Sequence, residues 1–103
     1  FQALASCSPA WYFQIVDSFA RAGVKYGLPK DSAVEIAAQA MAGAAALLLA
    51  ERENGTIPAQ LIDRVTSPGG TTIAGLLAAE EGGLSTALVG AVDASIHADS
   101  HLG

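Results

Sequence analysis

Charged and aromatic side chains are scarce in this chain of 103 residues. Only 15% of the residues are charged and 6% are aromatic, although 51% are hydrophobic. Alanine supplies much of the apolar fraction, and it is the best helix former although its side chain covers little surface. Such a composition predicts many helices whose thin side chains each bury little area. We therefore expect extra burial against another subunit.

Positive charge and cysteine are also scarce. Five Lys and Arg stand against ten Asp and Glu, so the net charge is −5, which argues against a nucleic-acid partner. The sequence contains no basic amphipathic segment of the kind that binds a membrane surface. The single cysteine cannot form an intrachain disulfide, which fits a reducing compartment, and we predict a cytoplasmic protein.

Long, strongly apolar runs are missing as well. The longest apolar stretch, Ile36–Ala50, is interrupted by Gln39 and consists mostly of alanine. A membrane span needs about twenty more strongly apolar residues, so we predict no span. The chain begins at Phe1 without an initiator methionine or a leader pattern, and we expect it to be a piece of a larger protein.

Helical periodicity dominates the pattern, and no segment alternates convincingly with a period of two, so we predict an all-α fold of about five helices. Ser8 should cap the first helix, with Pro9 at its first position. The expected helices run from Ser8 to Tyr26, from about Lys30 to Arg52, from Pro58 over a short stretch, from about Thr71 to Glu81, and from Leu84 to about His101.

Apolar stripes on four of these helices should face a core. The expected inward residues are Tyr12, Ile15, Val16, Phe19 and Ala22; Leu61, Ile62 and Val65; Ile73, Leu76 and Leu77; and Leu84, Ala87, Leu88, Ala91, Val92 and Ile96.

The second helix differs because it is apolar all round from Met41 to Ala50, with Gly43 allowing a close approach. A helix without a polar face is surrounded by protein. One subunit of this size can hardly enclose it, so we predict a dimer built around this helix.

The segment Thr66–Thr72, Thr-Ser-Pro-Gly-Gly-Thr-Thr, carries the clearest functional signal. Pro68 fixes a turn, while Gly69 and Gly70 let the backbone approach a ligand without a Cβ in the way. The free N–H groups of the following helix suit a small anion such as a carboxylate. We call residues 66–72 the cradle.

An ordinary turn and helix cap would use the same residue types, and this interpretation stays open. The surplus of hydroxyls, at Thr66, Ser67, Thr71 and Thr72, favours an anion site. The cradle contains no acid, base or nucleophile, so it would bind and orient a substrate while another part supplies the chemistry.

Other polar groups give weaker signals. Asp93, His97 and His101 fall on one ridge of the last helix, but they lack a further strong ligand and we predict no metal site. The sequence indicates no base that would deprotonate the Cys7 thiol, so we do not expect it to be reactive. Residues 80–81 are expected to be a solvated helix end. No G-x-G-x-x-G or Walker motif occurs, so the chain by itself cannot bind a dinucleotide in the Rossmann manner.

The cradle and its flanks closely resemble the signature region of Δ1-pyrroline-5-carboxylate reductases. The resemblance spans nearly the whole chain in the same order, and it is carried by residues 65–76, 80–84, 8–13, 17–24, 27–29 and 37–39. It covers the C-terminal helical half of that family. We therefore expect residues 1–103 to be a helical dimerisation and substrate-binding domain whose N-terminal Rossmann domain is absent from this chain.

The resemblance implies an interlocked helical-bundle dimer, similar to the C-terminal domain of 6-phosphogluconate dehydrogenase, in which dimers could assemble further. It also implies that the complete protein reduces a cyclic imino acid, 1-pyrroline-5-carboxylate, to L-proline with NADPH or NADH, and that the fragment alone is inactive. Ser67 and the amides of Gly70, Thr71 and Thr72 would hold the substrate carboxylate, with Gly69 completing the turn. The Thr72 hydroxyl would hydrogen-bond the ring nitrogen and so act in catalysis.

One departure from the family pattern lies before the first long helix. The family usually has Ser-Gly-Ser-Gly-Pro-Ala where this chain has Ala-Ser-Cys-Ser-Pro-Ala at residues 5–10. If Ser6, Cys7 and Ser8 approach the nicotinamide, the cofactor geometry or the substrate choice differs. A diverged reductase of another cyclic imine, or a non-catalytic dimerisation or regulatory module, therefore stays open as an alternative.

Overall fold

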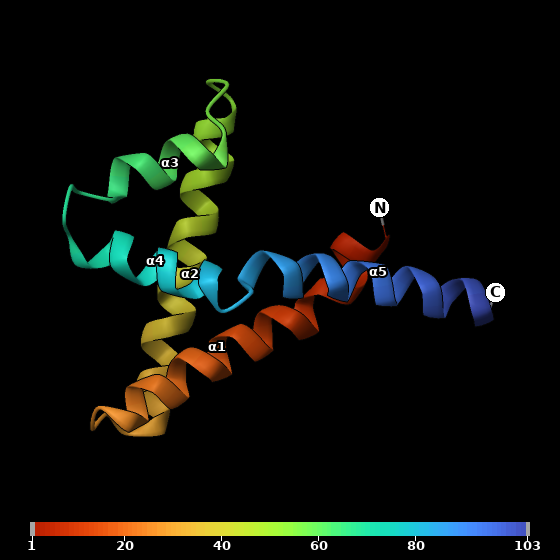
Figure 1. The fold of residues 1–103 in the computed structure, drawn as a ribbon, viewed down its shortest axis with the longest axis horizontal. Coiled ribbons are helices and arrows are strands. Elements are labelled where there is room, and N and C mark those ends of the chain that lie inside the picture. Colours follow the sequence, from red (N-terminus) through yellow and green to blue (C-terminus); the bar gives the residue numbers. More distant parts are fainter. Residues whose placement is uncertain (1, 103) are drawn as a thin grey trace. The chain divides into compact units, whose positions relative to one another are not determined.

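A computed structural model describes the backbone of residues 2–102 and the side chains of residues 2–99. This part of the chain is all-α and contains no strand. Its elements are a π-helical turn η1 (Ala3–Cys7) and the helices α1 (Ser8–Lys25), α2 (Lys30–Arg52), α3 (Pro58–Val65), α4 (Thr71–Glu81) and α5 (Leu84–Leu102) (Figure 1). They form two compact units, one of residues 8–57 and one that joins η1 to the segment after residue 57.

The helix bounds agree with the sequence prediction within a residue or two, and α1 begins at Ser8 as predicted. The prediction that Ser8 caps this helix is wrong, because helical backbone runs without a break from Gln2 to Lys25. Pro9 lacks an N–H and its ring would clash with the carbonyl four residues earlier in a regular α-helix. The wider π turn directly before Pro9 is the kind of local adjustment that accommodates it.

In the first unit, α1 and α2 form an antiparallel pair joined at a tight corner. Gly27 has φ +101°, and the Gly27 and Leu28 N–H groups donate to the carbonyls of Val24 and Gly23 at 3.0 Å. This is the Schellman arrangement, in which a left-handed glycine ends the helix. The two helices then diverge from the corner (Figure 1).

Small residues let α1 and α2 touch near that corner. A Cβ built on Gly23 would lie 2.9 Å from the Ala33 Cβ, so the two backbones meet without intervening side chains. Ala20 and Ala33 are 0% and 4% exposed. Close contact of this pair therefore depends on the absence of larger side chains.

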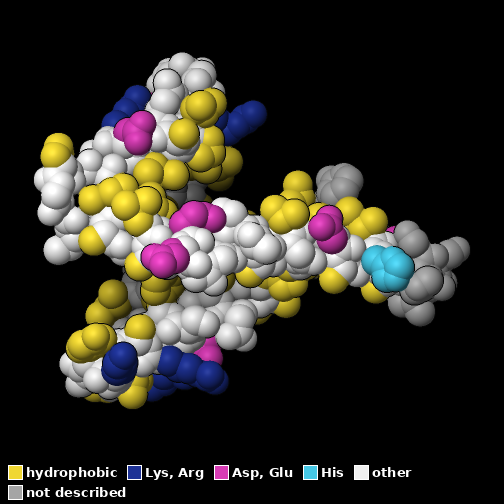
Figure 2. All heavy atoms as spheres, viewed as in Figure 1, with side chains coloured by type: hydrophobic (Ala, Val, Ile, Leu, Met, Phe, Trp, Pro, Cys, Tyr) yellow, Lys and Arg dark blue, Asp and Glu magenta, His cyan; other side chains and the backbone are white. Residues whose placement is uncertain are grey.

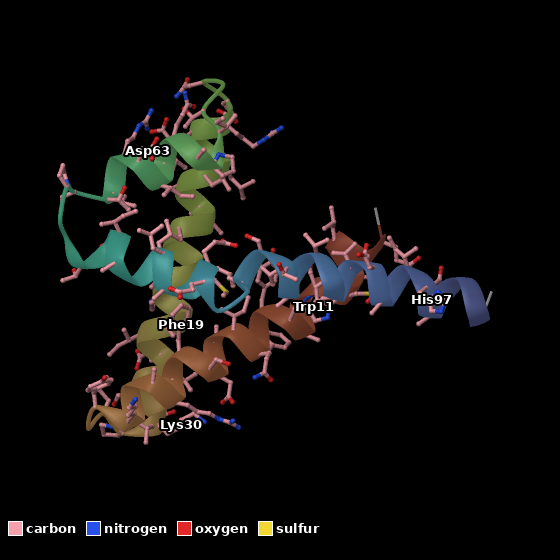
Figure 3. The ribbon with its side chains drawn as sticks, viewed as in Figure 1. Trp11, Phe19, Lys30, Asp63 and His97 are labelled. Carbon is pink, nitrogen blue, oxygen red and sulfur yellow. The ribbon has the colours of Figure 1, made fainter. Side chains whose placement is uncertain are left out.

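An ion-pair cluster supports the same corner on its polar side. Asp17 Oδ1 lies 2.9 Å from Lys30 Nζ, and Asp17 Oδ2 lies 3.0 Å from Arg21 Nε. These contacts lower the pKa of the Asp17 carboxyl, mainly through the hydrogen bond from Lys30. Asp17 therefore links α1 to Lys30, the first residue of α2, which Figure 3 labels.

In the second unit, η1 packs against α5, and α4 leads into α5 through a glycine turn. Gly83 has φ +95°. Across this turn the Ser85 hydroxyl donates to Glu80 Oε2 at 2.8 Å and the Ser85 N–H to Oε1 at 3.3 Å. Glu80 is exposed near the end of α4, as predicted, and its carboxylate also caps the N-terminus of α5.

A hydrophobic core is nearly absent from the described part of the chain. Its buried apolar residues are Ala3, Ala20 and Ala33, and none of its large side chains is fully buried. The hydrophobic side chains instead stand on the surface, in yellow in Figure 2. The exposed ones include Tyr12, Phe19, Ile62, Val65, Leu77, Leu84, Leu88 and Ile96, all predicted to face inward.

Those assignments are wrong for the single chain, although Ile15, Val16, Leu61, Ile73, Leu76, Ala91 and Val92 are half-buried. Ala22 and Ala87 are exposed as well. The apolar stripes exist as the periodicity indicates, but one chain has too few layers to cover them. Exposed apolar surface on this scale marks an interface.

Helix α2 is longer than the apolar stretch Ile36–Ala50. It is long enough to cross a membrane, and a window of 18 residues within it is apolar enough by composition alone, with a mean hydropathy of 1.7. The core helix of a soluble protein passes the same test. The pattern of α2 therefore requires an apolar environment without identifying it.

Candidate functional site

The cradle begins with a tight turn between α3 and α4. The Gly70 N–H donates to the Ser67 carbonyl at 3.0 Å, and Gly69 between them has φ +70°. Pro68 at the second position and a left-handed glycine at the third are typical of a type II β-turn. The sequence Ser-Pro-Gly-Gly thus folds locally as its residue types predict.

The Ser67 side chain folds back over Gly70. A Cβ built on Gly70 would lie 2.5 Å from Ser67 Oγ and 3.2 Å from the Ser67 carbonyl oxygen. Gly70 is also the N-cap residue of α4, with φ −82° and ψ 176°. The turn therefore places the Ser67 hydroxyl beside the N-terminus of α4.

This geometry changes the expected role of the Gly70 amide. Its N–H donates to the Ser67 carbonyl inside the turn, so it is already engaged rather than offered to a ligand. The amides of Thr71 and Thr72 come next, in the first turn of α4, where N–H groups lack intrahelical partners. No side chain caps α4 within the described residues.

The hydroxyls of the cradle divide into two kinds. The Thr66 hydroxyl donates to the Ile62 carbonyl at 2.8 Å, so it serves the C-terminal turn of α3. Ser67, Thr71 and Thr72 are exposed to solvent around the start of α4. Three of the four predicted hydroxyls thus belong to exposed residues at or next to the start of α4.

The chemistry available at this site is binding and orientation. Residues 66–72 include no titratable side chain. The N–H groups and the positive end of the helix dipole favour an anion, and hydroxyls can donate to or accept from a ligand. A carboxylate fits this set of donors.

The other sequence-predicted residues lie on separate elements. Ser6 and Cys7 belong to the π turn η1, where Ser6 is exposed and the free Cys7 is half-buried. Ser8, the first residue of α1, is buried at 7% exposure. Their proximity to a nicotinamide stays a prediction.

Asp93 and His97 stand exposed on α5, where Figure 3 labels His97. The side chain of His101 lies outside the described residues. Among the described residues, no group of three His, Cys, Asp or Glu side chains is placed to hold a metal ion.

Two apolar hollows flank the α1–α2 pair, each of about 500 Å³. One lies on the side of Phe19, Leu28 and Ile36. The other lies on the side of Tyr12 and Val34. Met41 borders both, and no sequence pattern indicates these hollows, because they depend on the divergence of the two helices.

Comparisons with known proteins give a consistent result. The family described as "Pyrroline-5-carboxylate reductase dimerisation" matches residues 1–102. A pyrroline-5-carboxylate reductase of Treponema pallidum is 47% identical over 93 residues, which is 90% of this chain and 34% of that protein. Human pyrroline-5-carboxylate reductase 2 is 45% identical over 92 residues, covering 89% of this chain and 28% of the relative.

Solved structures agree with these sequence matches. The 1-pyrroline-5-carboxylate reductase of Streptococcus pyogenes superposes with a TM-score of 0.85 at 40% identity, covering 94% of this chain and 36% of that one. A Plasmodium falciparum pyrroline carboxylate reductase with NADP bound gives a TM-score of 0.89 at 27% identity, covering 99% and 38%. The chain thus spans about a third of the length of the relatives it matches.

Proposed function

The chain belongs to the family of pyrroline-5-carboxylate reductase dimerisation domains, and from this premise we propose that it is the helical dimerisation and substrate-binding domain of such an enzyme. The complete protein would use NADPH or NADH to reduce 1-pyrroline-5-carboxylate to L-proline in the cytoplasm. The observation that carries the proposal is the cradle, whose Ser67 hydroxyl and unpaired α4 amides suit a carboxylate. The NADP-bound Plasmodium structure supports the cofactor.

Within the proposed site, the chain's own residues orient the substrate. The Ser67 hydroxyl and the amides of Thr71 and Thr72 would hold the carboxylate at the positive end of α4. The Thr72 hydroxyl would hydrogen-bond the ring nitrogen, which would take its proton from solvent water at this exposed position. When bound by a separate domain, the reduced nicotinamide supplies the hydride for the adjacent carbon. Such a site works by placement and by stabilising the nitrogen, so it needs no acidic or basic side chain of its own.

The proposed partner is a second copy of the same chain. Large apolar side chains on α1 and α2 are exposed in the single chain, including Phe13 at 72%, Phe19 at 65% and Leu49 at 65%. A homodimer would cover these side chains, and the description of the family as a dimerisation domain supports this partner. In this proposal protein, rather than lipid, provides the apolar environment of α2.

Steady-state kinetics of the complete enzyme test the site. Ser67→Ala removes a hydrogen bond to a charged group, about 1.5–3 kcal/mol, so KM for the imino acid should rise about 10- to 150-fold. Thr72→Val should lower kcat about a hundredfold, because it removes a donor that acts on the reacting atom. Thr72→Ser should restore most of that loss.

Ser32→Ala and Thr86→Val are matched controls, since both residues are exposed and belong to helices other than α4, and both variants should keep wild-type kinetics. Unchanged KM in Ser67→Ala together with unchanged kcat in Thr72→Val would remove the assignment. An inactive wild-type enzyme that still dimerises would favour the non-catalytic module. Activity restricted to another cyclic imine would favour the diverged reductase, which the replaced glycines at Ser6 and Ser8 already suggest.

A further inference from the structure

We propose that Gly70 is a positioning residue. Because Gly70 has no side chain, the Ser67 hydroxyl has room to lie beside the N-terminus of α4. The inference rests on the proposed function, because it concerns the placement of one carboxylate ligand in the cradle. It assigns Gly70 a steric role in place of the donor role that the sequence suggested.

Two other reasons for a glycine do not apply at position 70. Its N–H is engaged with the Ser67 carbonyl at 3.0 Å, and every residue except proline could donate that bond. Its φ of −82° and ψ of 176° are extended backbone that any residue adopts. Gly69 is different, because its φ of +70° itself favours glycine.

A side chain at position 70 would clash with Ser67. An added Cβ would lie 2.5 Å from Ser67 Oγ, 3.2 Å from the Ser67 carbonyl oxygen and 3.7 Å from the Ser67 Cβ. The carbonyl takes part in the turn hydrogen bond, so the backbone has little freedom to move. The Ser67 side chain can relieve the contact by rotating about χ1, and that rotation takes the hydroxyl away from the cradle.

A double-mutant cycle in the complete enzyme tests this coupling. Gly70→Ala should raise KM by about the same 10- to 150-fold as Ser67→Ala, because both remove the hydroxyl from the carboxylate. In the Ser67→Ala background, Gly70→Ala should change KM less than about twofold, since no Oγ remains to be displaced. Gly75→Ala is the control on the same helix, because a Cβ there would meet nothing within 4 Å.

The outcomes separate the inference from the proposed function. Wild-type KM in Gly70→Ala, or an equal effect of Gly70→Ala in both backgrounds, overturns the positioning role while leaving the Ser67 assignment intact. Wild-type KM in Ser67→Ala overturns the proposed role of Ser67 instead, and together with wild-type kcat in Thr72→Val it overturns the proposed site. In that case, a crystal structure of Gly70→Ala decides the positioning role: a rotated Ser67 side chain supports it and an unchanged rotamer overturns it.

Folding of the variants supplies an independent readout. If Gly70→Ala melts at a lower temperature, the double variant should recover most of the loss, because the contact with Oγ is gone. Equal destabilisation of the single and double variants would contradict a clash with the Ser67 hydroxyl.

Discussion

At the scale of single residues, Gly23, Gly69 and Gly70 are each required for a different structural reason. Gly69 supplies a positive φ, Gly70 leaves room for a neighbouring hydroxyl, and Gly23 lets one helix touch another. The sequence predicts a turn from Gly69 and Gly70 and a helix through Gly23, but it does not give the reason for each glycine, because that reason depends on which atoms lie opposite. A substitution at each position should therefore fail in a different way.

Asp17 gives the residue-scale prediction. Ion pairs with Lys30 and Arg21 lower its pKa in the folded chain below the ordinary value of 3.8. A lowered folded-state pKa means that the stabilisation is fully present above the unfolded-state value and is lost as the pH falls through the folded-state value. Asp17→Asn should therefore lower the melting temperature at pH 7, and its difference from wild type should shrink below pH 3.8.

Thermal melts across that pH range measure the effect. Asp99→Asn, an exposed carboxylate near the end of α5, controls for the change in net charge. A difference between wild type and Asp17→Asn that stays constant from neutral to acid pH would show that the ion pairs do not stabilise the corner.

At the scale of elements, helix ends follow the residue types that specify them. Gly27, Gly55 and Gly83 all have positive φ and end α1, α2 and α4, as the sequence predicts from their capping preference. The start of α1 is the exception. Ser8-Pro9 has the composition of an ordinary helix start, in which a capping serine precedes a proline at the first helical position. The backbone before Pro9 is already helical, and a π turn absorbs the proline.

The contact of Gly23 with α2 gives the element-scale prediction. A Cβ at position 23 would lie 2.9 Å from the Ala33 Cβ and 3.3 Å from Leu28 Cδ1. Gly23→Ala should therefore destabilise the protein by about 1–3 kcal/mol through overpacking, despite the better helix propensity of alanine. Chemical denaturation measures the free energy of unfolding.

The swapped variant Gly23→Ala/Ala33→Gly should recover part of that loss, because it removes the Ala33 Cβ with which the new side chain clashes. Gly90→Ala, where a Cβ meets nothing within 4 Å, should be neutral or stabilising. If Gly23→Ala behaves like Gly90→Ala, the two helices do not pack as closely as the structure shows.

At the scale of the whole molecule, the described part of the single chain nearly lacks a core of its own. The apolar residues buried within it are three alanines, which bury too little area to offset the entropy of ordering a hundred residues. Stability must come from covering the exposed apolar side chains. If the proposed dimer provides this cover, the stability of the folded state should depend on protein concentration.

Leu49 gives the prediction for the whole molecule. It is 65% exposed on the apolar part of α2, so Leu49→Glu should leave the helix intact while placing an unpaired charge in the proposed dimer interface. Burying such a charge costs several kcal/mol, and the dimer dissociation constant of the complete protein should rise at least about a hundredfold. Sedimentation velocity over a concentration series measures it.

Asn54→Asp adds the same charge in the turn after α2 and should leave the dimer unchanged. A stable wild-type monomer at micromolar concentration would contradict the dimer, and vesicle association of the wild type that Leu49→Glu abolishes would instead assign α2 to lipid.

The sequence by itself determined the all-α class, most helix bounds, the Ser-Pro-Gly-Gly turn and the need to cover α2, because these follow from periodicity and from the φ preferences of single residues. The tertiary structure decided which polar groups remain available. Thr66 donates to Ile62, the Gly70 amide donates to Ser67, and Glu80 accepts from Ser85. A hydrogen bond forms only where the donor and the acceptor meet at a suitable distance and angle, and only the folded backbone sets this geometry.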